Sequence, residues 1–396
     1  MSQIGMEEEI SQRLNRFQHE LTALNLDGAL VVQKIDLYYF SGTDQDAHLW
    51  VPASGQPVLM VRRSMERATE DAAIQQIVPL NSFSQIPEYI LNSGGSSGSG
   101  RIGLEMDVLP VNRYLIYQRL FPEKEFVDVS SAIRETRMIK SPHEISEVSK
   151  AALMADATYH KIPEFLSDAP REIDLTGRIE AFYRSQGHPG IIPTRGFNNE
   201  SIYGQIMSGK WAATPSSSAG PLGGRGLGPF FSQGSTMEPI GRHEPILVDY
   251  AANFNGYISD LTRIFSLGRL NQPLTRAHSV TREIQDALAQ KGRPGIRAET
   301  LYDLALEMVE AAGLMSGFMG YPDPVPFVGH GVGLELDEWP IIGRGSHTIL
   351  AEGMVIALEP KIVFPGQGVV GIENTFVVTK NGMKKLNTFP DAITVC

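Results

Sequence analysis

Apolar residues near the N-terminus recur first at helical spacing and then in short runs. Five of them follow one another at intervals of four, three, four and three residues, which predicts an amphipathic helix. They are Ile10, Leu14, Phe17, Leu21 and Leu24. The apolar runs 28–32 and 58–61 then predict buried strands. Helices that alternate with strands in this way indicate a small α/β domain, which we assign to residues 1–137.

A second pattern of helices begins after residue 137. Pro142 precedes apolar residues at helical spacing, which predicts a helix from about Glu144 onward. Two more helices are predicted at 275–291 and 298–312, and short apolar runs typical of strands lie around them. We therefore expect residues 138–396 to form a larger second domain, in which helices cover a sheet.

Composition and charge narrow the classes of function. The chain has 396 residues, 42% of them hydrophobic, which is enough for two domains with substantial cores. Its net charge of −11, with no basic cluster, argues against nucleic-acid binding. The chain shows neither a run of about 18 apolar residues nor a signal peptide, so we expect no membrane association. Cys396 is the only cysteine and precludes an internal disulfide, which fits a cytoplasmic protein.

A candidate hairpin carries two carboxylates. The apolar run 246–248 leads into Asp249, and a turn-like segment at 253–256 precedes Asp260. With Phe254-Asn255 as the loop, Asp249 would stand opposite Asp260, and both side chains would leave the same face of the sheet. Like charges so placed destabilise a hairpin unless a cation lies between them.

A second candidate hairpin repeats this arrangement. Two β-type runs flank the turn signal 364–368, and Glu359 and Glu373 are symmetric about Gly366. His330 lies in a glycine-rich segment where backbone and substrate can approach closely. Four carboxylates and one imidazole suit Mn(II), Fe(II), Co(II) or Zn(II), and the spacing favours a pair of ions. The expected ligands are Asp249, Asp260, His330, Glu359 and Glu373.

Four segments around these residues carry a resemblance to a known family. They are 256–263 after Asp249, 329–334, 353–360 and 372–375. Together they resemble the pita-bread metallopeptidases, which include methionine aminopeptidase, aminopeptidase P, prolidase and the non-peptidase creatinase. The resemblance is densest over residues 140–396, and the segment 137–141 fits the proline-specific branch. It implies an α+β chain: a pita-bread catalytic domain, with a curved antiparallel sheet covered by helices, and a creatinase-like N-terminal domain.

The resemblance also implies roles for the five residues. Asp249 would chelate one ion, His330 would complete the other, and Asp260 and Glu373 would bridge both. Glu359 would bind the second ion and carry a proton to and from the bridging water, which attacks as hydroxide. Manganese is the expected metal, with cobalt, zinc and iron as alternatives. A homodimer is implied, in which the N-terminal domain of one chain closes over the partner's site.

Three positions depart from the family pattern. Asp337 stands where proline-specific members carry a second histidine, and Ser216 replaces another histidine. Gly371 stands where an arginine usually precedes the last glutamate ligand by two residues. The glycine-rich segment 217–234 follows Ser216 and reads either as a surface loop or as a lid whose Arg225 contacts an anionic substrate group.

Two functions follow. We predict a dinuclear-metal hydrolase that cleaves the Xaa-Pro bond of peptides or dipeptides, with Glu359, Asp337 and Ser216 as candidate catalytic residues. The alternative is a non-peptidase relative, a creatinase-like amidine or amide hydrolase or a lyase, that acts on a small polar substrate. Loss of two imidazoles changes the groups that contact substrate, which keeps the alternative open.

Overall fold

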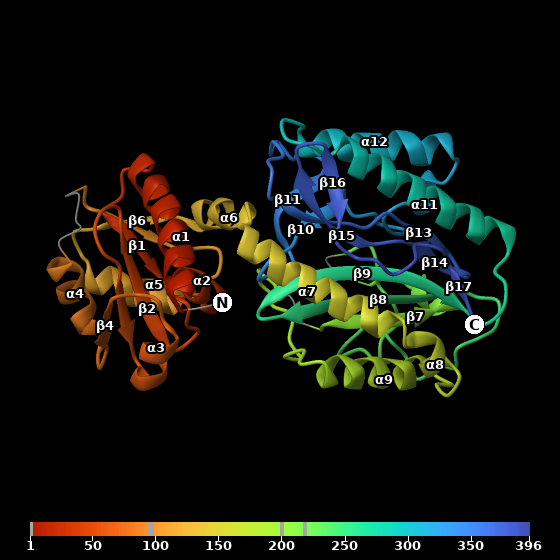
Figure 1. Ribbon diagram of the computed structural model, residues 1–396, viewed down its shortest axis with the longest axis horizontal. Helices are drawn as coiled ribbons and strands as arrows, with labels where there is room; N and C mark the ends of the chain where they lie inside the picture. Colours follow the sequence, from red (N-terminus) through yellow and green to blue (C-terminus); the bar gives the residue numbers. More distant parts are fainter. Residues whose placement is uncertain (1–2, 94–98, 199–201, 217–219) are drawn as a thin grey trace. The chain divides into compact units, whose positions relative to one another are not determined.

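The computed structural model describes residues 3–93, 99–198, 202–216 and 220–396 (Figure 1). Residues 94–98, which lie in a Ser- and Gly-rich stretch, and residues 217–219 at the start of the glycine-rich segment 217–234, are outside the described residues. The chain divides into two compact units, Met1–Arg137 and Met138–Cys396.

A six-stranded mixed sheet forms the centre of the first unit. Its strand order is β4-β3-β2-β1-β5-β6, in which β1–β2 and β2–β3 are antiparallel and the other pairs are parallel. The predicted strands at 28–32 and 58–61 are confirmed as β1 and β3. The strands are β1 Gly28–Val31, β2 Ala47–Pro52, β3 Val58–Val61, β4 Gln76–Pro79, β5 Arg101–Leu104 and β6 Glu125–Asp128.

Helices flank this sheet, and the longest is the one predicted from the apolar periodicity. Ile10, Leu14, Phe17 and Leu21 are buried as expected. Leu24 lies past the end of the helix and is 40% exposed, because the turn takes it away from the apolar stripe. The helices are α1 Gln3–Ala23, α2 Lys34–Ser41, α3 Met65–Asp71, η1 Phe83–Gln85, α4 Ile86–Asn92, α5 Val111–Leu120 and α6 Ser130–Met138.

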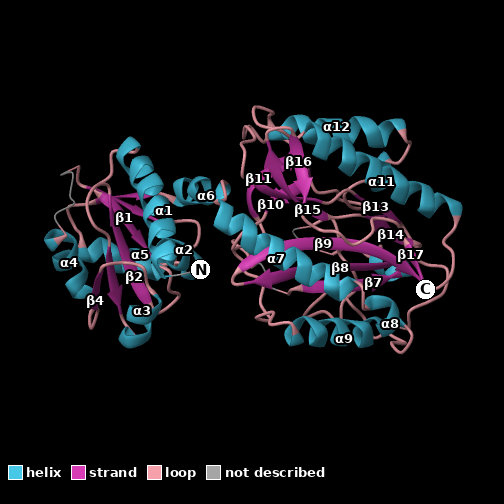
Figure 2. Ribbon diagram, viewed as in Figure 1, coloured by secondary structure: helices cyan, strands magenta, loops and turns pink. Residues whose placement is uncertain are grey.

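Three sheets build the second unit, as far as its described residues show. An antiparallel sheet has the order β11-β10-β12-β15-β16, a second has the order β17-β9-β8-β7, and β13 pairs with β14 alone. Figure 2 shows these strands in the interior and helices outside them. The strands are β7 Gly204–Ser208, β8 Ile246–Phe254, β9 Tyr257–Ser266, β10 Phe327–Gly331, β11 Glu338–Gly343, β12 Val355–Leu358, β13 Lys361–Phe364, β14 Gly368–Gly371, β15 Asn374–Thr379, β16 Gly382–Lys385 and β17 Thr394–Val395.

Helices cover the strands of the second unit. Two of them, α11 and α12, confirm the helices predicted at 275–291 and 298–312. α11 packs on β13, β14 and β16, and α12 packs on β10 and β11 (Figure 1). α7 lies along β8 and β9, and a capping box between Ser141 and Glu144 fixes its start. The helices are α7 Pro142–Tyr159, α8 Ile162–Leu166, α9 Glu172–Ser185, α10 Gly209–Ala212, α11 Gln272–Lys291, α12 Ala298–Ala311 and η2 Met315–Gly317. Among the described residues, no helix is long and apolar enough to cross a membrane.

The β8–β9 hairpin turns one residue later than predicted. Asn255 and Gly256 form its loop, both with positive φ, as the favoured Asn-Gly hairpin turn requires. Asp249 therefore pairs with Thr262, and Asp260 pairs with Ala251, so the prediction that the two aspartates stand opposite each other is wrong. Since Thr262 and Asp260 are two residues apart, both carboxylates still leave the same face.

Arg263 ties the two larger sheets of this unit together. Its guanidinium is buried and donates to the carbonyls of Thr262, Glu373, Phe389 and Pro390. It also donates to Asn374 Oδ1 and forms an ion pair with Asp391 at 2.8 Å. Because these partners come from β9, from the start of β15 and from the segment after β16, Arg263 fixes Glu373 against the strand that carries Asp260.

We expect Arg263→Met to destabilise the second unit by about 3–5 kcal/mol, since it removes a buried donor from four backbone carbonyls and breaks the ion pair with Asp391, which keeps its contacts with Lys385 and Asn374. The matched control is Lys161→Ala, which removes an exposed pair with Glu164 and should leave the unfolding midpoint unchanged. Thermal unfolding followed by calorimetry compares the two variants. Equal midpoints would contradict the structural role of Arg263.

Candidate metal centre and substrate pocket

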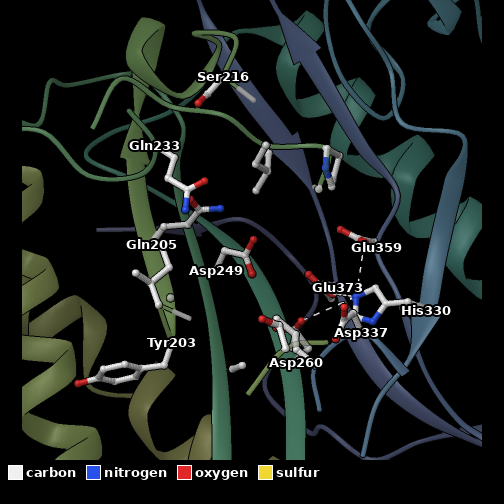
Figure 3. Close-up of a pocket in the computed structure, with 18 of the residues that line it drawn as sticks. Tyr203, Gln205, Ser216, Gln233, Asp249, Asp260, His330, Asp337, Glu359 and Glu373 are labelled. Atoms are coloured by element: carbon white, nitrogen blue, oxygen red, sulfur yellow. Dashed lines mark ion pairs between the residues drawn. The ribbon is translucent and has the colours of Figure 1, made fainter. Parts of the chain in front are cut away.

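The structure brings the five predicted ligand residues to one pocket (Figure 3). They come from neighbouring strands or strand ends: Asp249 on β8, Asp260 on β9, His330 on β10, Glu359 directly after β12 and Glu373 directly before β15. The predicted symmetry of the glutamates about Gly366 agrees with the observed register, in which Leu358 pairs with Asn374 and Phe364 pairs with Gly368. The pocket has a volume of about 520 Å³.

His330 directs one ring nitrogen toward three carboxylates. Its Nδ1 lies 3.1 Å from the carbonyl of Gly331, so a proton on Nδ1 can donate to that carbonyl and leave the lone pair of Nε2 for a ligand. Nε2 lies 3.6 Å from Glu359 Oε1, 3.8 Å from Glu373 Oε1 and 4.0 Å from Asp260 Oδ2. Ligand atoms about 2.1 Å from a common ion stand roughly 3–4.2 Å apart, so each of these three oxygens lies at a distance from Nε2 that a shared divalent ion allows.

One oxygen of Glu373 supports this interpretation. Glu373 Oε1 is buried and has no hydrogen-bond partner, which is costly for a carboxylate oxygen unless a cation binds there. Asp260, His330 and Glu373 also offer ligand atoms within 4.8 Å of one another. An oxygen-rich set with one imidazole therefore fits a divalent ion on the side of His330.

The other side of the carboxylate cluster holds a lysine. Lys361 Nζ lies 2.7 Å from Glu359 Oε2, 2.8 Å from Glu373 Oε2 and 3.7 Å from Asp249 Oδ2, and the side chain is 1% exposed. Burial lowers the pKa of this ammonium, but the three carboxylates outweigh burial and raise the pKa well above its ordinary value. Lys361 is therefore charged.

Asp249 and Asp260 have raised pKa values when no ion is bound. Burial raises the pKa of Asp260 well above its ordinary value, and the charges of Glu373 and Asp249 raise it further. Burial also raises the pKa of Asp249, an effect that Lys361 partly offsets. A bound divalent ion would favour the ionised carboxylates, so metal binding and proton release are linked here.

Asp337 and Ser216 line the same pocket as the candidate ligands. Asp337 Oδ1 accepts a hydrogen bond of 2.8 Å from the backbone N–H of Arg195, which holds the carboxylate in place. Ser216 lies apart from the candidate ligands in Figure 3, and its hydroxyl donates to the carbonyl of Ser232 in the glycine-rich insertion. The insertion thus contributes to the pocket, through Phe230, Phe231 and Gln233 among others.

Two residues important to the site were missed from the sequence. Thr375 Oγ1 lies 2.8 Å from the backbone nitrogen of Asp260 and 3.0 Å from its carbonyl, so it fastens this residue to β15. Lys361 was missed although a signal existed. The symmetry about Gly366 that pairs the two glutamates also pairs Lys361 with Gly371, the position where the family arginine is absent.

Comparison with known proteins agrees with this geometry. Residues 146–380 match the model of metallopeptidase family M24, and residues 13–139 match that of the Creatinase/Prolidase N-terminal domain. A Xaa-Pro dipeptidase of Pyrococcus furiosus is 26% identical over 379 residues, which cover 95% of this chain and 98% of the relative. A Xaa-Pro dipeptidase of Lactobacillus helveticus is 28% identical over 382 residues, which cover 94% and 95%.

The fold is also that of solved relatives. The prolidase from Pyrococcus horikoshii OT3 matches with a TM-score of 0.79 at 25% identity, over 96% of this chain and 99% of that one. The expected architecture is thereby confirmed: a pita-bread domain follows a smaller creatinase-like α/β domain. Because the family model spans more than half of its residues, this chain belongs to metallopeptidase family M24.

Proposed function

We propose that this chain is a metal-dependent hydrolase that cleaves the Xaa-Pro bond of dipeptides or short peptides. The observation that carries the proposal is the set of three carboxylate oxygens within 4.0 Å of His330 Nε2, in a pocket large enough for a dipeptide. Relatives named Xaa-Pro dipeptidase align over nearly the whole chain, which supports the same bond as the target.

His330, Asp260, Glu359 and Glu373 would hold the divalent ion. When bound, such an ion polarises a carbonyl oxygen and lowers the pKa of water toward neutrality. The carbonyl of Gly331 keeps the imidazole of His330 in the tautomer that leaves Nε2 free. Thr375 and Arg263 keep Asp260 and Glu373 at fixed positions, so little reorganisation is needed on binding.

Glu359 is the candidate proton carrier. Its Oε1 faces His330 and its Oε2 accepts a hydrogen bond from Lys361. In hydrolysis, water adds to the peptide carbonyl carbon, the C–N bond breaks, and one proton of the water must reach the departing imino nitrogen of proline. A carboxylate in this position can take the proton from the water and deliver it to that nitrogen.

A panel of substrates tests the proposal. Purified protein loaded with Mn(II) is assayed with Xaa-Pro dipeptides, with longer Xaa-Pro peptides and with the same peptides in which alanine replaces proline. We expect cleavage only before proline, and the length preference separates a dipeptidase from an aminopeptidase. No cleavage of any Xaa-Pro peptide by protein that holds its metal would overturn the proposal.

Asp337 favours the second candidate function. An acid in place of an imidazole suits a cationic group on the substrate, as in a small amidine, better than it suits a peptide carbonyl. Hydrolysis of a small polar non-peptide substrate is therefore the alternative.

Asp337→His distinguishes the two candidates. If the wild type is an Xaa-Pro peptidase whose pocket works with Asp337 in place of a histidine, kcat/KM for Xaa-Pro dipeptides should not rise in this variant. A rise of about a hundredfold, the typical effect of one well-placed acid–base group, would favour the alternative. Asp323→His, at an exposed position outside this pocket, is the matched control.

Three further expectations remain predictions: manganese as the ion, the homodimer and the cytoplasmic location. The oxygen-rich ligand set is consistent with manganese but does not select it over iron, cobalt or zinc.

A further inference from the structure

Lys361 and Gly371 face each other across the β13–β14 ladder. A Cβ atom at Gly371 would lie 2.7 Å from Lys361 Cγ, closer than such atoms approach, so a side chain at 371 and the stem of Lys361 compete for one space. The positive charge that the family carries at this position therefore comes here from the opposite strand. Lys361 places its ammonium directly against the carboxylates.

The two oxygens of Glu373 are occupied unequally. Oε2 accepts hydrogen bonds of 2.8 Å from both Thr262 Oγ1 and Lys361 Nζ, which uses its two lone pairs. Oε1 is buried and accepts none. Glu373 can therefore give a metal ion one oxygen on the side of His330, while its oxygen on the side of Asp249 is already engaged.

Other ligand atoms divide in the same way. Glu359 directs Oε1 toward His330 and Oε2 toward Lys361. Asp260 directs Oδ2 toward His330, while its Oδ1 accepts the backbone N–H of Leu261 at 3.0 Å. Asp249 Oδ2 lies 3.7 Å from Lys361 Nζ, and Gln205 stands opposite Asp249 on the neighbouring strand. Glu359 Oε1, Glu373 Oε1 and Asp260 Oδ2 therefore face His330. On the side of Asp249, the carboxylate oxygens accept hydrogen bonds from protein donors.

We propose that the ammonium of Lys361 takes the place of one of the two divalent ions, so that each chain binds one ion, on the side of His330. This inference rests on the proposed metal-dependent function, and it replaces the expectation of two ions. A second ion on Glu373 Oε2 and Asp249 would lie within a few ångströms of a buried ammonium, where the repulsion between cations is strong because little water screens it. Asp249 then acts as a partner of Lys361 and not as a ligand.

The number of bound ions tests the inference without any turnover. Metal-free protein is titrated with Mn(II) by calorimetry, bound metal is counted by elemental analysis, and the Mn(II) spectrum is recorded by electron paramagnetic resonance. We expect one ion per chain in the wild type, with the resolved spectrum of an isolated Mn(II). Lys361→Met, purified in the presence of Mn(II), should bind two ions and show the spectrum of an exchange-coupled pair.

Asp249→Asn provides a second test that keeps Lys361 in place. If Asp249 is not a ligand, this variant still binds one ion with unchanged affinity, whereas a two-ion site would lose one. Two ions in the wild type, loss of an ion in Asp249→Asn, or a single ion in folded Lys361→Met would each overturn the inference. Failure of Xaa-Pro cleavage with one ion bound would instead count against the proposed function alone.

Discussion

Glu359→Gln is expected to lower kcat for Xaa-Pro cleavage by about 10³-fold or more. The substitution keeps the shape of the side chain but removes the charge and the ability to take up and release a proton, a function that alone contributes about 10²–10⁴-fold. It also exchanges one carboxylate oxygen for an N–H donor. In the wild type, Glu359 Oε2 lies 2.7 Å from Lys361 Nζ, so the new donor must face either that ammonium or the candidate ion on the other side. Initial rates at saturating Mn(II) measure the effect.

A nearby exposed glutamate provides the control for Glu359→Gln. Glu352→Gln alters the same residue type seven positions earlier, at an exposed site outside the pocket, and should retain full activity. Circular dichroism and metal content establish that both variants are folded and loaded. Activity of Glu359→Gln within tenfold of the wild type would exclude Glu359 as the proton carrier.

Asp260→Asn is expected to separate metal affinity from stability. The substitution removes a charged ligand, so affinity for Mn(II) should fall by at least about 100-fold. The metal-free variant should nevertheless unfold a few degrees above the metal-free wild type, because the buried, mutually repelling carboxylates lose one charge. Calorimetric titration and thermal unfolding with and without Mn(II) measure the two effects.

The stability gain of metal-free Asp260→Asn should depend on pH in a defined direction. The folded wild type holds the proton of Asp260 more tightly than the unfolded chain does, because the pKa of this carboxyl is raised in the fold. The contribution of the protonated Asp260 carboxyl to folding stability is therefore fully present below the ordinary aspartate pKa of about 4. It is lost as pH rises through the raised pKa. The advantage of asparagine should be small at pH 4 and grow toward pH 7. An advantage that shrinks over this range would contradict the stated electrostatics.

The sequence predicted the parts of the fold that depend on local pattern. The periodic apolar positions of α1 and the runs that form β1 and β3 were recognisable because burial on one face, or on both, dictates them. The turn after Asn253 was misplaced by one residue, because Asn253 to Gly256 offers two overlapping turn signals and only the Asn-Gly pair matches the twist of a two-residue hairpin.

The spacing of ligand-type residues predicted which side chains form the candidate site, but not how their individual oxygens are hydrogen-bonded. Ligand-type residues in fixed order along paired strands indicate that they share a face, and the structure places all five in one pocket. The unequal occupation of the oxygens of Glu373 could not be predicted, since it depends on which way Thr262 and Lys361 point. Nor could the sequence show that Ser216 binds the insertion while Asp337 is held by the backbone of Arg195.

Metal-dependent cleavage before proline is measured as the rate of hydrolysis of an Xaa-Pro dipeptide while Mn(II) is added back to metal-free protein, with the matched Xaa-Ala dipeptide alongside. We predict no cleavage in the presence of a chelator, a rise to a plateau as the site fills, and cleavage of the proline substrate alone. Cleavage that persists in chelator, or metal-loaded protein that leaves the Xaa-Pro bond intact, would contradict the account.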